Sequence, residues 1–138
     1  MRVFFDTSSY LKNFVFETGS NRVEGLLAST TELGLSIICF PEIISALNRK
    51  RRERLLDKAD YKLLKSSILA SIEDADIINI SYLSINKITQ LLEKNSLRSL
   101  AAIHIAAAIE WQAELFVSAD NRQTDAANNS GLRTRLIN

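Results

Sequence analysis

Short, continuous apolar runs alternate along this chain with longer stretches of helical periodicity. The runs at residues 3–5, 35–40 and 115–117 contain no polar residue apart from one serine. Such runs are typical of strands that are buried on both faces of a parallel sheet. Weaker alternation predicts two more short strands, at residues 76–80 and 132–137. The pattern therefore predicts a sheet of four or five strands.

Apolar residues recur every three or four positions between these runs, which predicts helices. Gly34 follows one periodic stretch, as a residue beyond a helix C-terminus does, and Pro41 is tolerated in the first turn of a helix. Ser84 and Ser99 offer hydroxyls for N-caps. The predicted helices cover residues 10–14, 21–31, 41–54, 61–72, 85–94, 100–111 and 121–128.

Strands that alternate with helices predict an α/β fold with right-handed crossovers. We expect a three-layer α/β/α sandwich around a central parallel sheet, with the strand at residues 3–5 in the middle. At 138 residues the length fits a single domain over residues 1–138.

Composition adds little to this picture except in one segment. The chain has 17 basic and 16 acidic residues and a net charge of +1, so no global field indicates nucleic acid. The basic cluster at residues 48–54 fits a solvated helix end and a phosphate-contacting patch equally well. Cys39 is the only cysteine, which excludes an internal disulfide. With no apolar segment long enough to span a bilayer, we expect a cytoplasmic protein.

Three carboxylates stand at the ends of predicted strands or just after them. Asp6 and Asp120 each follow an apolar run, and Glu42 opens the helix after another. Alone, Glu42 is explained by the helix dipole, which favours an acid there. Because the carboxyl ends of parallel strands share one edge of a sheet, the three acids can converge. Clustered hard oxygen ligands suit Mg²⁺ or Mn²⁺, so the sequence predicts metal-dependent phosphoryl transfer.

Four short motifs, taken in order, resemble those of PIN-domain ribonucleases, most closely the VapC toxins of prokaryotic toxin–antitoxin pairs. They are FDTS at 5–8, PEIISALNR at 41–49, LRSLAAIH at 97–104 and FVSAD at 116–120. The resemblance implies a metal-dependent endoribonuclease with Asp6, Glu42 and Asp120 as its catalytic and metal-binding acids. It also implies an RNA substrate, a cognate antitoxin and a homodimer.

The resemblance also assigns supporting roles and shows one departure. Thr7 or Ser8 and Ser118 would orient the carboxylates or a metal-bound water. The family normally has an aspartate three residues before the histidine of the third motif, where this chain has Ala101. A methyl group cannot bind a cation, so the departure predicts a weakened metal site. Asp125, one turn beyond Asp120, can compensate in part or be a plain surface acid.

Two further interpretations bear on the site. His104 lies on an alanine-rich helix, where a packed and hydrogen-bonded histidine is the usual finding, so we leave it out of the catalytic set. A receiver domain is rejected because the third predicted strand ends in Ser81 and no lysine follows Lys94. The remaining alternative is a PIN-like module that binds RNA or a protein without cutting. Ala101 favours that module, and the other three acids favour the enzyme.

Overall fold

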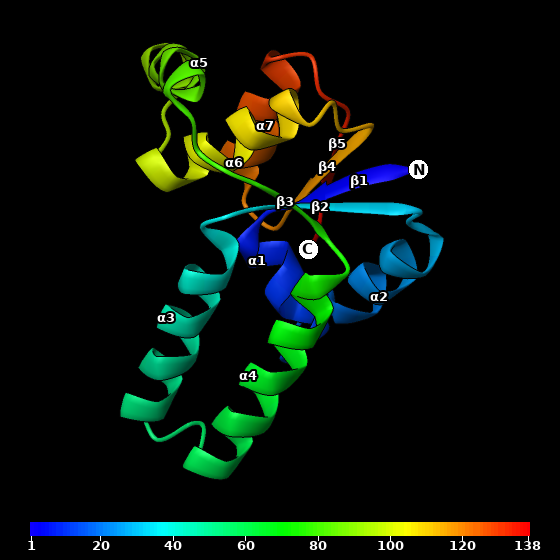
Figure 1. Cartoon of the computed structure of the whole chain (residues 1–138), viewed down its shortest axis with the longest axis vertical. Coiled ribbons are helices and arrows are strands. Elements are labelled where there is room, and N and C mark those ends of the chain that lie inside the picture. Colours follow the sequence, from blue (N-terminus) through cyan, green and yellow to red (C-terminus); the bar gives the residue numbers. More distant parts are fainter.

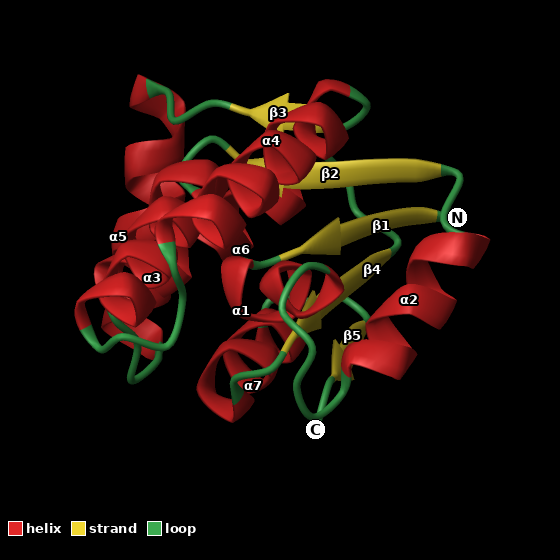
Figure 2. Cartoon of the chain, turned by 90° about the horizontal axis from the view of Figure 1, so that it is seen from below, coloured by secondary structure: helices red, strands yellow, loops and turns green.

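The computed structural model describes residues 1–138 and contains one five-stranded parallel sheet. The strand order is β3-β2-β1-β4-β5, so the strand that precedes Asp6 lies in the centre of the sheet. Helices cover both faces (Figures 1 and 2), which confirms the predicted α/β/α sandwich. The strands are β1 (Arg2–Phe5), β2 (Glu32–Ser36), β3 (Asp76–Ile78), β4 (Leu115–Ser118) and β5 (Thr134–Leu136).

Seven α-helices and one short 3-10 helix connect the strands. They are α1 (Thr7–Tyr10), the 3-10 helix η1 (Leu11–Asn13), α2 (Ser20–Ser29), α3 (Cys39–Arg52), α4 (Lys58–Glu73), α5 (Tyr82–Lys94), α6 (Ser99–Glu110) and α7 (Asn121–Asn129). None of these helices has the length and apolar character that a membrane crossing requires.

Alternation along the central strand divides the core into two layers. Val3 and Phe5 point into a cluster that includes residues of α2, α3 and α4. Phe4 points to the other face, where it packs with the alanine-rich α6 and with α7. Small side chains let α6 approach the sheet closely, and Trp111 closes this layer beside Phe4 with ring centroids 6.2 Å apart. Both faces of β1 are therefore covered, as its continuous apolar run predicts.

The predicted boundary between the second strand and the third helix is wrong. β2 covers Glu32–Ser36, and α3 already begins at Cys39, so the apolar run at 35–40 is divided between two elements. Gly34 does not end a helix but lies within β2, where an added Cβ would be 2.7 Å from the Trp111 ring. A glycine is needed there because an aromatic ring approaches the backbone too closely for any side chain.

Two local predictions also need correction. Ser81, rather than Ser84, is the N-cap of α5, and the two serines form a reciprocal capping box. Ser99 is the first residue of α6, whose N-cap is Arg98 without a side-chain hydrogen bond. These shifts of one to three residues leave the order of the predicted elements unchanged. The first predicted helix, at residues 10–14, is wrong in its bounds, because α1 covers Thr7–Tyr10 and the 3-10 helix η1 covers Leu11–Asn13.

Helices α3 and α4 form an arm that extends away from the sheet (Figure 1). The basic cluster lies at the outer end of α3, with Arg49, Lys50, Arg51 and Arg52 in its last turn. The guanidinium carbon of Arg51 lies 4.8 Å from the centroid of the Tyr61 ring, so part of this cluster packs against α4.

Candidate functional site

Asp6 lies where β1 gives way to α1, and its carboxylate is enclosed by hydrogen-bond donors. It is 1% exposed and caps α1 by accepting from the Ser9 backbone N–H at 2.9 Å. The hydroxyls of Ser8 and Ser9 donate to the same Oδ1 at 2.9 and 2.8 Å. Ser8 also reaches Oδ2 at 2.8 Å, and Ser118 donates to Oδ2 at 2.7 Å. A buried carboxylate is stable here because each of its oxygens accepts hydrogen bonds.

Glu42 lies in the first turn of α3 and is linked to two other elements. Its Oε1 accepts a hydrogen bond from Thr7 Oγ1 at 2.6 Å and is 2.6 Å from His104 Nε2. Partial burial acts to raise the pKa of Glu42, but the hydrogen bonds from His104 and Thr7 outweigh it and the pKa is lowered. Glu42 is therefore held ionised, with Oε2 free of hydrogen bonds.

His104 is the partner of Glu42 that sequence reasoning did not identify. It is 2% exposed, and its Nε2 is also 3.1 Å from Thr7 Oγ1. Because Thr7 donates its only hydroxyl proton to Glu42, both oxygens beside Nε2 are acceptors, which assigns the proton to Nε2. The other ring nitrogen, Nδ1, is buried without a hydrogen-bond partner. His104 is thus packed and hydrogen-bonded as expected, and it also orients a candidate site acid.

Asp120 is the N-cap of α7, and its exposed side chain accepts from the Arg122 backbone N–H at 2.8 Å. Ser118 joins it to the buried acid of β1, since its Oγ donates to Asp6 and accepts from the Asp120 N–H at 3.0 Å. Ser8 makes a similar link by accepting from the Ala119 N–H at 3.1 Å. The ends of β1 and β4 are thereby tied together at one edge of the sheet.

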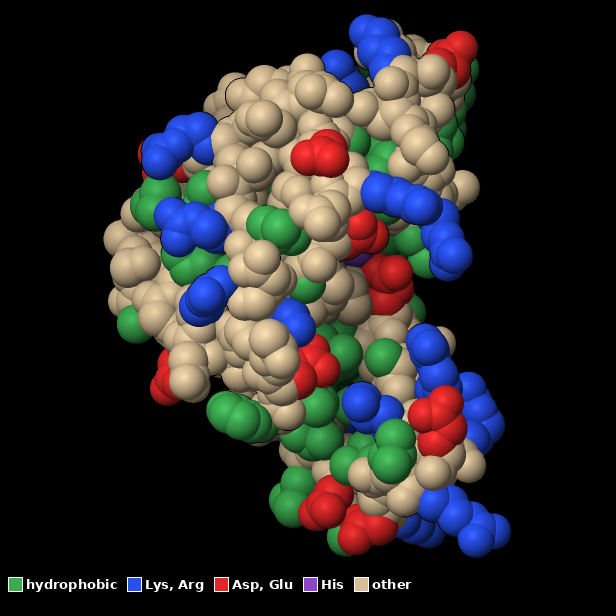
Figure 3. All heavy atoms as spheres, turned by 180° about the vertical axis from the view of Figure 1, so that it is seen from behind, with side chains coloured by type: hydrophobic (Ala, Val, Ile, Leu, Met, Phe, Trp, Pro, Cys, Tyr) green, Lys and Arg blue, Asp and Glu red, His purple; other side chains and the backbone are tan.

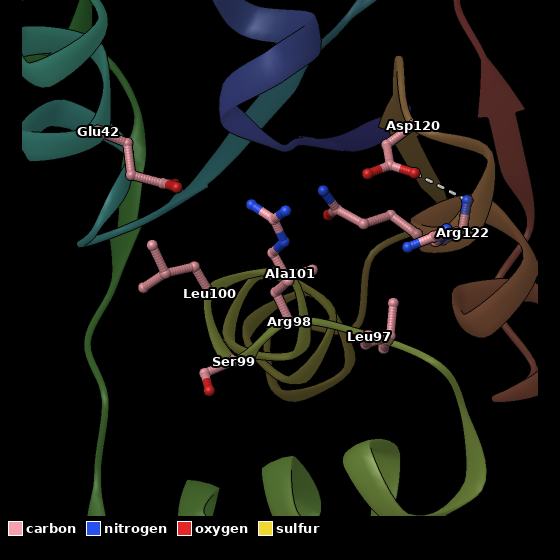
Figure 4. A pocket seen from close by; sticks show the side chains of 9 residues that line it. Glu42, Leu97, Arg98, Ser99, Leu100, Ala101, Asp120 and Arg122 are labelled. Carbon is pink, nitrogen blue, oxygen red and sulfur yellow. Dashed lines mark hydrogen bonds between the residues drawn. The ribbon is translucent and has the colours of Figure 1, made fainter.

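Glu42 and Asp120 line the same pocket, which has a volume of about 390 Å³. Figure 4 shows their carboxylates on opposite sides of it, above the first turn of α6. On the surface, acidic side chains gather in the hollow between the α3–α4 arm and the rest of the molecule, with basic side chains on both sides (Figure 3). Ala101 also lines the pocket and brings only a methyl group to it.

The oxygen ligands at the pocket are of the kind that binds a divalent cation, but they are too few. Glu42 and Asp120 each keep one carboxylate oxygen without a hydrogen bond, and such hard oxygens suit Mg²⁺ or Mn²⁺. Asp6 does not line the pocket: both of its oxygens accept hydrogen bonds, and it is joined to Asp120 through Ser118. No three acidic, histidine or cysteine side chains lie close enough together to hold one ion. The open ligands are thus two, where an aspartate at position 101 would add a third.

The remaining lining residues were not predicted from the sequence. Arg98, Arg122 and Gln123 all border the pocket, whereas Asp125 is exposed on α7 and does not. Asp125 is therefore a plain surface acid in this structure. No signal in the sequence marks the other three, because they come from a loop and a helix whose orientation is set by packing.

A match to a protein-family model shows the family of this chain. Residues 3–129 match the PIN domain family, so the chain belongs to that family, whose members are generally nucleases. A search of curated proteins finds no match.

Several solved structures share this fold at low sequence identity. FitAcB from Neisseria gonorrhoeae is 15% identical with a TM-score of 0.75, and the match covers 96% of this chain and 95% of that one. VapBC2 from Rickettsia felis, bound to a DNA fragment from its promoter, is 14% identical with a TM-score of 0.71 over 100% of both chains. VapC20 from Mycobacterium tuberculosis, a toxin that cleaves the sarcin-ricin loop, is 13% identical with a TM-score of 0.70 and coverages of 94% and 95%.

Proposed function

We propose that this chain is a toxin-type endoribonuclease whose carboxylate site holds Mg²⁺ or Mn²⁺ weakly. The observation that carries the proposal is the convergence of Glu42 and Asp120 on one pocket of a PIN fold, with Asp6 joined to Asp120 through Ser118. Glu42 and Asp120 would bind the cation, which when bound neutralises phosphate charge and promotes ionisation of water.

Neighbouring residues of the chain would hold the carboxylates of this site in position. His104 and Thr7 hold Glu42 in its ionised form, and Ser118 fixes the position of Asp120 relative to Asp6. The side chains of α3 on one side and α7 on the other leave an open pocket that a phosphodiester can enter, and the two free carboxylate oxygens would hold a cation between themselves and the phosphate. Because the proposed substrate is RNA, we also propose that the chain acts in the cytoplasm.

The test is RNA cleavage with Mn²⁺ and with EDTA, together with calorimetric Mn²⁺ titration. We expect weak Mn²⁺ binding that is lost in Asp120→Asn, and cleavage that is slow and depends on metal. As a control, Asp125→Asn changes the same charge one turn away on an exposed face and should leave Mn²⁺ binding unchanged. Equal binding by the chain and by Asp120→Asn would reject the assigned ligands.

A second candidate is a PIN module that binds RNA or a protein without cutting. It is favoured by the lack of a three-ligand cluster and by the methyl group of Ala101 in the pocket. Tight RNA binding without cleavage, both by this chain and by Ala101→Asp, would support the non-catalytic module.

We also propose an antitoxin partner and a homodimer. Proteins with this fold include toxin–antitoxin complexes, and an inserted arginine fork suits the paired carboxylates. Large apolar side chains on the helices support further interfaces, since Leu63, Tyr82 and Leu83 are 70%, 85% and 82% exposed. Light scattering would measure the dimer, and a pull-down with the product of the neighbouring gene would test the antitoxin. A protein that is monomeric and does not bind that product would contradict both proposals.

A further inference from the structure

The pocket contains two arginines whose charges have no partner within the protein. Arg98 and Arg122 both line it, yet neither guanidinium takes part in a hydrogen bond or a salt bridge. In Figure 4 the Arg98 side chain extends from the start of α6 towards the space between Glu42 and Asp120. Both arginines are exposed as well as unpaired, so their charges are available to an anionic ligand that enters the pocket.

Gln123 adds a buried polar group that also lacks a partner. It is 8% exposed on α7 and lines the same pocket, and its Oε1 is buried without a hydrogen bond. Its Nε2 makes no hydrogen bond to the protein either, so two N–H donors remain free at the pocket. The buried Oε1 is an acceptor that a phosphate cannot satisfy, but the N–H groups of Nε2 can donate to a ligand in the pocket.

The first turn of α6 faces the same pocket and carries no compensating negative charge. The helix has 12 residues, its N-cap Arg98 makes no side-chain hydrogen bond, and its first turn contains no acid. Backbone N–H groups at such a helix start bind anions, and the helix dipole places about half a positive charge there. Ser99, Leu100 and Ala101 of this turn all line the pocket.

The balance of charges follows from the residue at position 101. Glu42 and Asp120 contribute −2, and Arg98 and Arg122 contribute +2, so the lining has no net charge before the helix dipole is added. An aspartate in place of Ala101 would make the lining negative and would also neutralise the helix start. The methyl group that removes a metal ligand therefore also removes a charge that would repel an anion.

We propose that Arg98, Arg122, Gln123 and the N-terminus of α6 form a subsite for a phosphodiester group of single-stranded nucleic acid. The choice of nucleic acid rests on the proposed function, whereas the anion site rests on the unpaired donors alone. The two guanidinium groups bind the phosphate oxygens, and the Gln123 amide donates a neutral hydrogen bond to the same group.

The test measures fluorescence anisotropy of a labelled single-stranded RNA in EDTA, over a series of salt concentrations. Arg98→Gln and Arg122→Gln should each weaken binding about 10-fold. Each should also reduce the slope of log affinity against log salt by about 0.7, the value for one phosphate contact on a single strand. Arg133→Gln is the matched control, because this exposed arginine precedes β5 at the opposite edge of the sheet and should change neither quantity.

Gln123→Met separates a ligand site from a structural role. Methionine has a similar length and no buried amide, so the free protein should be as stable as the original or more stable in a thermal melt. RNA binding should nevertheless fall about 5-fold with no change in the salt slope, because a neutral hydrogen bond is lost. A labelled DNA of the same sequence distinguishes a ligand recognised by phosphate alone, which binds equally, from one recognised through the 2′-hydroxyl.

The results separate this proposal from the proposed nuclease activity. RNA affinity and salt slope that are unchanged in both arginine variants would overturn the subsite, whatever cleavage is observed. Failure to bind RNA at all in EDTA would overturn it too. Loss of binding in these variants, combined with the absence of metal-dependent cleavage in every form of the chain, would support the subsite and reject the nuclease.

Discussion

Replacing Ala101 with aspartate should convert the pocket from two open carboxylates to three. Ala101 is 9% exposed and is the third residue of α6, so the new side chain starts at the pocket wall. An acid in the first turn of a helix is stabilising by about 0.3–1 kcal/mol, so the variant should fold. We expect tighter Mn²⁺ binding and RNA cleavage that requires the metal.

The magnitude follows from the charges in the pocket. A carboxylate about 4 Å from a unit positive charge contributes about 4 kcal/mol at an effective dielectric constant of about 20. Desolvation of the ion offsets part of this attraction, and so does pairing of the new carboxylate with Arg98. A gain of about 10- to 100-fold in metal affinity is therefore expected, which is the usual effect of one ligand or its support.

The assay compares Mn²⁺ titration and RNA cleavage for the original chain, for Ala101→Asp and for the same variant combined with Asp6→Asn. Ser99→Asp is the matched control, because it adds the same charge to the same turn while its side chain points away from Glu42 and Asp120 in Figure 4. We expect faster cleavage by Ala101→Asp than by the original chain and none after Asp6→Asn is added, with all cleavage abolished by EDTA. If Ala101→Asp binds Mn²⁺ no better than Ser99→Asp and cuts no RNA, the assigned ligand geometry is wrong.

Four other predictions concern the fold and one contact of the site. Gly34→Ala should lower the free energy of unfolding by about 1–3 kcal/mol, since the new Cβ would be 2.7 Å from a tryptophan ring. Gly25→Ala, a helical position with nothing within 4 Å, should instead stabilise the chain by about 0.5–1 kcal/mol in the same urea titration. Burial raises the pKa of Cys39 to about 12, so iodoacetamide should modify it only in urea, and rapid labelling of the native protein would refute its burial. Thr7→Val removes a hydrogen bond that lowers the pKa of Glu42. A carboxyl group whose pKa is lowered by folding stabilises the folded state at pH values above its unfolded pKa, which is about 4.3 for glutamate. This stabilisation is lost as the pH falls through the folded pKa. The stability difference between Thr7→Val and the original chain should therefore be largest at neutral pH and should shrink in acid.

The sequence predicts the layers of the fold more completely than the site. The apolar runs that become β1 and β4 are buried on both faces, so their ends, and with them Asp6 and Asp120, follow from periodicity alone. The boundary of β2 could not be predicted, because Gly34 is required by a ring that comes from residue 111. A local signal for turn or helix end carries no information about a distant side chain.

The site shows the same limit more strongly. The pairing of Glu42 with His104 joins positions 62 residues apart, and neither residue carries a local pattern that indicates it. Arg98 and Gln123 resemble ordinary surface residues in the sequence, and only the packing of α6 and α7 places them at one pocket. Whether the three acids act on a metal stays a prediction, with the two open carboxylates as its structural basis.

The hydrogen bonds of Asp6 also determine when the site can exist. Its Oδ2 accepts from Ser118, a residue 112 positions later, and β1 pairs with β4 on that side. During synthesis from the N-terminus, β1 is made first but its carboxylate has no such partner until most of the chain has been produced. Until then Oδ2 has only the hydrogen bond from Ser8, and the side of β1 that pairs with β4 is open, so the central strand should not be enclosed early. Any activity of this site therefore begins only after β4 has joined the sheet, and an incomplete chain without β4 should be inactive.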